Sequence, residues 1–363
     1  MLPQNPAVYL NNYAVGLQKA CGFVRLKSSY NENIENNKLK EKGESCMKKK
    51  LRKFVQYVFV FLLIIFAIGF TYQGISASKD IKKYTSVGEM YEVYGNKMHI
   101  YIGGEGDSTI VFNAGWGTAN PYADFFPLYE KLEKDTKYAV IDRFGYGYSK
   151  MTDRERDIDN IVDETRQLLE KSGQKPPYIL VGHSLASLET IRYAQRYPDE
   201  VKGIVLVDGG NPEYYSEPKP AAIFFSKVLG FLRTTGVLRI AYQVNEDFFI
   251  ESRNSLEFVP AELKEIDRAF TLIKVGNKNV TDEMHQIRHN AEKVLENPNI
   301  EVPITVLTAD SFGEIKEDWL QSQIELSTWS SSGKHIVVKD ANHSIHHYQP
   351  DAIAAEILRM LKQ

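Results

Sequence analysis

Cysteine is nearly absent from this chain of 363 residues. Its two cysteines, Cys21 and Cys46, both precede the long apolar run, so the chain after residue 46 has no thiol. That part can hold neither a disulfide nor a cysteine nucleophile, and it suits any redox compartment. A charge excess is also lacking. The 44 basic and 47 acidic residues leave a formal net charge of -3, which gives no electrostatic reason to expect nucleic acid as a partner.

Charged residues are missing altogether from residues 54–70, which read FVQYVFVFLLIIFAIGF. As a helix this run spans roughly 26 Å at about 1.5 Å per residue, enough to cross the hydrocarbon core of a membrane. Five positive charges in residues 48–53 precede the run, and such a flank stays in the cytoplasm. The sequence therefore predicts a single-pass anchor within residues 47–75, with the chain after Phe70 on the extracytoplasmic side of the cell membrane.

The fate of this segment is open between an uncleaved anchor and a cleaved signal peptide. Residues 76–78 are Ser-Ala-Ser, the small side chains that a signal peptidase needs, and cleavage would give a secreted protein. The apolar run is longer than a usual signal core, which favours the anchor. Polar residues 76–88 are predicted to be a linker.

Residues 1–46 are rich in Asn, Lys and Glu, and no stable fold is expected there. A related hypothesis is that the natural chain starts at Met47. The run Met47-Lys48-Lys49-Lys50 begins like a bacterial signal or anchor, and residues 42–44 can be encoded by a ribosome-binding sequence.

Short apolar runs alternate with helical patterns after residue 88, which indicates a mostly parallel sheet covered by helices on both faces. The runs predicted as strands are 91–94, 98–102, 109–113, 138–142, 178–182, 203–208, 304–307 and 335–338, the first two as a hairpin. Between them, residues 213–299 show helical patterns and no convincing strand. The core is therefore predicted as 89–212 and 300–363, with 213–299 as a helical lid over the strand ends.

A serine stands where a predicted strand turns into a helix, in Gly182-His183-Ser184-Leu185-Ala186. Such a sharp turn lifts a nucleophilic hydroxyl above the sheet, and small residues two before and two after it allow the strand and helix to approach. The pentapeptide alone is weak evidence, because a serine often simply caps a helix. Four apolar residues before it and a helical pattern after it favour Ser184 as a nucleophile.

A serine nucleophile needs a base that an acid orients, and in this arrangement the chain order is serine, acid, histidine. His343 follows the last predicted strand and precedes the last helix, so it is the predicted base. His346 and His347 are expected at the surface or leading the helix. No metal is expected, because no carboxylate or cysteine cluster with ligand spacing joins these histidines.

Two aspartates could orient His343. Asp208 ends one predicted strand and Asp310 follows the next, and both strand ends lie beside the serine in such a sheet. The other aspartate would then be an ordinary turn or capping residue. The glycine-rich stretch at residues 113–117 follows the third strand, and we expect the backbone N–H groups of Trp116 and Leu185 to stabilise an oxyanion.

Together these features resemble the α/β-hydrolase superfamily from about residue 91 to the C-terminus, with an expected eight-stranded sheet. Residues 142–149, DRFGYGYS, are similar to the stretch after the fourth strand in that family, and residues 197–201, YPDEV, match the turn after the helix that follows the nucleophile. Asn342 departs from the usual glycine before the histidine. The closest resemblance is to bacterial membrane-anchored serine hydrolases, in which an aspartate after the sixth strand is regular, and this favours Asp208 over Asp310.

The expected activity is hydrolysis of an ester or related acyl bond through an acyl-enzyme, with a small acyl substrate and no cofactor. Aminopeptidase or amidase activity is the alternative within this fold, and a non-catalytic surface binding protein is the alternative outside enzymes. Phenylalanines in the predicted lid suggest an apolar acyl or aromatic group, although they could equally form the core of the lid. These are Phe224, Phe225, Phe231, Phe248 and Phe249.

Overall fold

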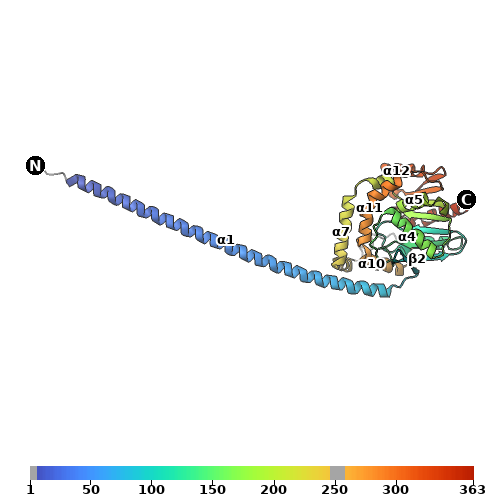
Figure 1. Ribbon diagram of the computed structural model, residues 1–363, viewed down its shortest axis with the longest axis horizontal. Coiled ribbons are helices and arrows are strands. Elements are labelled where there is room, and N and C mark those ends of the chain that lie inside the picture. Colours follow the sequence, from blue (N-terminus) through green and yellow to red (C-terminus); the bar gives the residue numbers. More distant parts are fainter. Residues whose placement is uncertain (1–5, 246–257) are drawn as a thin grey trace. The chain divides into compact units, whose positions relative to one another are not determined.

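The computed structural model describes residues 6–245 and 258–363. The chain divides into two units, Met1–Ile68 and Gly69–Gln363. One long helix, α1 (Pro6–Lys83), makes up the described part of the first unit, and its C-terminal part belongs to the second unit (Figure 1). The stretch Met47–Lys83 of α1 is long and apolar enough to cross a membrane, by length and composition.

Helix α1 extends beyond the apolar run in both directions, which differs from the expectation. The sequence predicts no stable fold for residues 1–46, whereas residues 6–46 are helical in the structure. It also predicts a linker over residues 76–88, whereas the helix continues to Lys83. After Pro6 no proline interrupts the chain before the end of α1, so every residue there has the backbone N–H that a continuous helix requires.

The second unit is built on one eight-stranded sheet with the strand order β1-β2-β4-β3-β5-β6-β7-β8. The pairs β1–β2 and β2–β4 are antiparallel, and all other pairs are parallel. The strands are β1 Glu89–Val93, β2 Asn96–Gly104, β3 Thr109–Asn113, β4 Lys137–Asp142, β5 Tyr178–His183, β6 Val201–Val207, β7 Ile304–Ala309 and β8 Gly333–Val338. All eight predicted strands occur, with slightly different ends.

Two apolar layers enclose the sheet, because successive strand residues point to opposite faces. On β5, Leu180 packs in one layer, and Ile179 and Val181 pack in the other. Helices cover both faces, as Figure 1 shows. The helices of the core are α2 Pro121–Asp124, α3 Phe126–Leu132, α4 Ile158–Lys171, α5 Ala186–Arg196, α12 Glu317–Ser327, α13 Ile345–Tyr348 and α14 Pro350–Leu361, with short 3-10 turns at Pro198–Glu200 and Ser311–Gly313.

Between β6 and β7 the described residues form helices and no strand, as the sequence predicts. We call residues 212–295 the insertion. Its described helices are α6 Pro212–Ser216, α7 Pro220–Thr234, α8 Val237–Val244, α10 Ala261–Lys274 and α11 Lys278–Leu295. Helix α11 packs against α5, α6 and α7, so it connects the insertion to the core.

Candidate active site

Ser184 lies in a tight turn between β5 and α5. Its φ of 54° falls in the left-handed region that favours glycine, so its backbone is strained. Strand and helix approach closely here, because a Cβ at Gly182 would lie 2.4 Å from Thr190 Oγ1 and 3.0 Å from the Ala186 carbonyl oxygen. A glycine is therefore required at this position. The backbone has the sharp strand-to-helix geometry that the sequence predicts for the turn.

The side chain of His343 bridges Ser184 and Asp208. Its Nε2 lies 2.8 Å from Ser184 Oγ, and its Nδ1 lies 2.6 Å from Asp208 Oδ2. The three residues follow β5, β6 and β8, whose carboxyl ends meet at one edge of the parallel sheet. His343 is half exposed, whereas Asp208 is buried. The imidazole is therefore accessible from solvent, whereas the carboxylate that bonds it is not.

Asp208 is held in place by donors other than the imidazole. Its Oδ1 accepts a hydrogen bond from the Ala309 N–H at 3.1 Å and one from the Trp319 indole at 3.3 Å. These bonds leave Oδ2 to His343 and fix the direction from which the carboxylate approaches the imidazole.

Asp310, the alternative acid, has different partners. Its Oδ1 accepts hydrogen bonds from the N–H groups of Phe312 at 3.0 Å and Ala341 at 3.2 Å. Asp310 thus caps the turn after β7, and its bond to the Ala341 N–H holds the loop that leads to His343. The structure brings Asp208, and not Asp310, to the Nδ1 atom of the imidazole.

The glycine-rich loop after β3 lies directly beside the serine. A Cβ at Gly115 would lie 3.1 Å from the Cβ of Ser184, so only glycine permits this approach without a shift. In the described part of the chain, no protein acceptor bonds the backbone N–H of Trp116 or Leu185. Two such N–H groups next to a serine can donate to an oxyanion.

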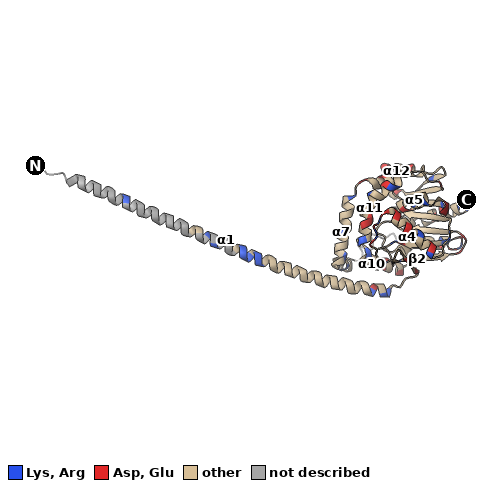
Figure 2. Ribbon diagram, in the orientation of Figure 1, with Lys and Arg blue, Asp and Glu red and all other residues tan. Residues whose placement is uncertain are grey.

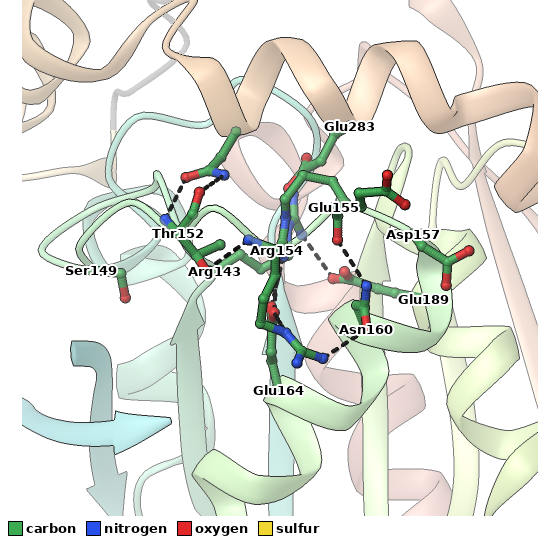
Figure 3. A network of polar contacts seen from close by, with 12 residues as sticks. Arg143, Ser149, Thr152, Arg154, Glu155, Asp157, Asn160, Glu164, Glu189 and Glu283 are labelled. Atoms are coloured by element: carbon green, nitrogen blue, oxygen red, sulfur yellow. Dashed lines mark hydrogen bonds and ion pairs between the residues drawn. The ribbon is translucent and has the colours of Figure 1, made fainter. Parts of the chain in front are cut away.

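A buried polar network behind this loop centres on Arg143, which follows β4. Its Nη1 donates to the Ala114 carbonyl oxygen and to Glu189 of α5, both at 2.7 Å, and its Nε donates to Glu283 of α11 at 3.3 Å. Figure 3 shows these side chains converging from the core and the insertion. The network thus places one guanidinium against two carboxylates. Burial raises the pKa of Glu189 to about 7, and the positive charge of Arg143 only partly opposes this shift.

Helix α11 also contacts the glycine-rich loop directly. The Trp116 indole donates to the Val280 carbonyl oxygen at 2.8 Å. The Tyr146 hydroxyl donates to Glu283 at 2.5 Å and accepts from the Gly117 N–H at 3.3 Å. The loop that carries the predicted oxyanion donor is therefore held by a helix of the insertion.

Asp124 and three histidines form a buried cluster next to the serine turn. His346 Nε2 and His347 Nε2 each lie 3.2 Å from a carboxylate oxygen of Asp124, and His183 Nε2 lies 3.0 Å from the His343 carbonyl oxygen. The ligand atoms of Asp124, His183 and His346 lie within 4.8 Å of one another, so these three residues could hold a metal ion. Burial lowers the pKa of His346 to about 4, which keeps its imidazole neutral near pH 7.

This cluster corrects two expectations from the sequence. His346 and His347 are buried rather than at the surface, and a carboxylate does join the histidines. Asp124 lies more than two hundred residues before them in the chain, so no local spacing could have indicated the pairing.

Tyr215 of α6 is a site residue that the sequence did not reveal. It is buried, and burial raises the pKa of its hydroxyl, an effect that the neighbouring Ser184 side chain opposes. A Cβ at Gly210 would lie 2.1 Å from the Tyr215 ring, so glycine makes room for it. Nothing in the sequence pattern distinguishes Tyr215 from its neighbour Tyr214.

The phenylalanines that the sequence singles out do not form the core of the insertion where the structure describes them, whereas Phe270 of α10 is buried there. Phe224, Phe225 and Phe231 are exposed, and Phe248 and Phe249 lie outside the described residues.

Comparison with known proteins identifies the fold. Residues 108–241 match the profile of the α/β-hydrolase fold. The chain is also 34% identical over 317 residues to YbdG, an uncharacterized protein of Bacillus subtilis strain 168, covering 84% of this chain and 96% of YbdG. The chain belongs to the α/β-hydrolase fold family. The fold and the sheet predicted from the sequence are thereby confirmed.

Other relatives of this α/β hydrolase have named activities. A pimeloyl-[acyl-carrier protein] methyl ester esterase of Shewanella woodyi is 30% identical over 112 residues, which cover 31% of this chain and 40% of the esterase. The crystal structure of an enol-lactonase from Burkholderia xenovorans LB400 superposes with a TM-score of 0.59 at 19% identity, over 76% of this chain and all of the lactonase chain. The structural likeness shows the fold alone, and the esterase-type relatives support a hydrolase.

Proposed function

We propose that this protein is a membrane-anchored serine hydrolase that cleaves an ester or a related acyl bond through an acyl-enzyme. The observation that carries the proposal is the bridge formed by His343, with Ser184 Oγ at 2.8 Å on one side and Asp208 Oδ2 at 2.6 Å on the other. A serine, a histidine and a buried acid at these distances are the parts that convert a hydroxyl into a nucleophile.

In the proposed reaction, Ser184 Oγ attacks the acyl carbonyl carbon while His343 Nε2 takes the hydroxyl proton. Asp208 orients the imidazole through Nδ1 and stabilises the imidazolium that forms. The N–H groups of Trp116 and Leu185 donate to the oxyanion. His343 then gives its proton to the leaving alcohol, which leaves the acyl group on Ser184. A water molecule, deprotonated by His343, releases the acid and restores the serine. No cofactor is needed.

The insertion supplies a wall of the proposed site. Helix α6 brings Tyr215 to the serine, and α11 holds the glycine-rich loop through Trp116 and Glu283. These contacts support a cap that shapes the acyl site and that is fastened to the core at α11.

The apolar part of α1 would anchor the enzyme. Residues 54–70 carry no charge, and the basic residues 48–53 directly before them, blue in Figure 2, favour a cytoplasmic N-terminus. The Gly69–Gln363 unit would then work on the other side of the cell membrane.

A panel of substrates tests the reaction type. Wild type and Ser184→Ala are compared on p-nitrophenyl esters of increasing chain length and on aminoacyl-naphthylamides. We expect ester turnover in the wild type that falls at least about 10³-fold in the variant, because the nucleophile is removed. Faster turnover of the naphthylamides would assign a peptidase instead. Equal rates in both proteins would contradict the proposed role of Ser184.

A further inference from the structure

Helix α7 packs inward through small residues as well as through Ile223 and Leu232, and it leaves other apolar side chains exposed on its outer face. Ser226 is buried and shares a 2.8 Å hydrogen bond with Thr281 of α11. Gly230 is also buried, because a Cβ there would lie 2.2 Å from the Gly276 carbonyl oxygen. On the outer face, by contrast, Phe224 and Phe225 are 69% and 57% exposed. A helix that packs through its small residues and leaves aromatic rings outside is the reverse of the pattern for a helix facing water.

Helix α8 also leaves apolar side chains exposed, although Leu238 and Tyr242 on its inward side are buried. Its apolar residues Val237, Ile240 and Val244, spaced three and four apart, lie on one face and are exposed. Its inward side includes Arg239, which donates to Gln73 at 2.9 Å and to Asp80 at 2.8 Å. The two helices meet at residues 235–236 and are bent by 82°. We call the exposed residues of both helices, Phe224, Phe225, Val237, Ile240 and Val244, the outer face.

The turn between α7 and α8 lies against the end of the apolar run of α1. A Cβ at Gly69 would lie 2.1 Å from the Thr235 carbonyl oxygen, and a Cβ at Gly236 would lie 2.7 Å from the Gly69 carbonyl oxygen. Gln73, one helical turn further along α1, donates to the Leu272 carbonyl oxygen at 2.7 Å. All of these residues belong to the second unit.

This contact limits the distance between the outer face and a bilayer. Gly69 is the last residue but one of the uncharged run 54–70, so a chain anchored by that run leaves the hydrocarbon at about the level of Gly69. Because Gly69 touches Thr235 and Gly236, the turn between α7 and α8 is held at that level. At about 1.5 Å per residue, Ile240 and Phe225 lie within roughly 15 Å of the turn along their helices.

We propose that the outer face of α7 and α8 inserts into the lipid interface next to the anchor, so that the hydrolase rests on the bilayer as well as being tethered to it. The occupant of this face is lipid. Apolar helix faces bind at the boundary between headgroups and acyl chains, where aromatic rings are favoured. The inference rests on the anchor of the proposed function, but not on the reaction.

The test uses the full chain in lipid nanodiscs. Cys21→Ser and Cys46→Ser remove the native thiols, and single cysteines are then introduced for labelling with an environment-sensitive fluorophore. Phe225→Cys and Ile240→Cys report on the outer face. Val60→Cys reports on the predicted membrane span, and Lys175→Cys, in the exposed loop before β5, is the control. Thermal unfolding of each labelled protein checks that it is folded.

We expect blue-shifted emission at Val60, Phe225 and Ile240, quenched several-fold by lipids that carry a nitroxide on the acyl chain, and no change at Lys175. Unshifted emission at Phe225 and Ile240 with a shifted Val60 would overturn the inference and leave the anchor intact. A shift at the outer face without quenching would mean that a second copy of the chain or another protein covers it, which also overturns the inference. An unshifted Val60 would refute the anchor itself, and the inference with it.

Discussion

His343 Nδ1 lies 2.6 Å from Asp208 Oδ2, so the carboxylate that bonds the imidazole follows β6, whereas Asp310 after β7 caps its own turn. The position of Asp208 has a structural cost, since its φ of 44° is in the left-handed region. Hydrogen bonds from Ala309 and Trp319 hold the carboxylate there. Asp208 therefore follows β6, and its carboxylate is held by donors from β7 and α12.

Separate replacement of the two aspartates tests this arrangement. We expect Asp208→Asn to lower kcat by about 10³- to 10⁴-fold with little change in KM, because an amide cannot stabilise the imidazolium and favours the wrong tautomer of His343. Asp310→Asn is the matched control and should stay within about threefold of wild type. Steady-state kinetics on one p-nitrophenyl ester measure both. A larger loss in the Asp310 variant would reverse the assignment.

Removing the indole donor of Trp116 tests whether α11 positions the glycine-rich loop. In Trp116→Phe the Val280 carbonyl oxygen loses its partner, at a cost of about 1 kcal/mol. We expect kcat to fall about fivefold while KM changes little, because the oxyanion donor moves and ground-state binding does not. Trp329→Phe, which alters an indole packed in the core, should leave kcat unchanged. Equal effects of the two changes would indicate a general loss of stability instead.

The burial of Glu189 predicts how the stability of the protein depends on pH. The pKa of Glu189 is raised to about 7 from its usual 4.5, so between these pH values the folded protein keeps a proton that the unfolded chain loses. The free energy of unfolding should therefore fall as pH rises through that window, by at most about 3 kcal/mol.

Glu189→Gln should remove this pH dependence, because the amide mimics the protonated acid. Urea unfolding at several pH values between 4.5 and 7.5 measures the slope, and Glu170→Gln, at an exposed position, is the control. A slope unchanged by Glu189→Gln would show that the raised pKa does not govern stability.

Prolonged treatment with a chelator tests the Asp124 cluster. The proposed reaction uses no metal, so ester turnover and the thermal midpoint should both be unchanged after chelation and dialysis. A loss that added Zn²⁺ restores in the wild type but not in His346→Gln would assign a metal to Asp124, His183 and His346.

The sequence predicted the parts of the fold that depend on local patterns. Apolar runs gave all eight strands, and the glycine spacing around Ser184 gave the sharp turn. Chain order also predicted that His343 would lie near Ser184, and the family resemblance favoured Asp208 as the acid, although the roles of these residues stay predictions. Between Asp208 and Asp310 the residues alone gave no choice, because both aspartates follow strands that end beside the serine.

Contacts between distant segments could not be predicted. Arg143 and Glu283 lie 140 residues apart, and a charged residue on an amphipathic helix gives no sign of being buried. The same holds for Asp124 and its histidines. In helix α7, by contrast, apolar residues are exposed. The helix is apolar around much of its surface, so its sequence alone does not predict that Ser226 faces inward and Phe225 outward.

Labelling with a fluorophosphonate tests whether Ser184 is an activated nucleophile, because this reagent reacts with a serine only when a neighbouring base activates the hydroxyl. The full chain in nanodiscs is treated with the probe, and the labelled peptide is located by mass spectrometry. Ser344→Ala, beside His343, serves as the control for loss of a different serine nearby. We expect stoichiometric label on Ser184 in the wild type and in Ser344→Ala, and none in Ser184→Ala. If the folded wild-type protein takes no label, or carries it on another serine, Ser184 is not the nucleophile.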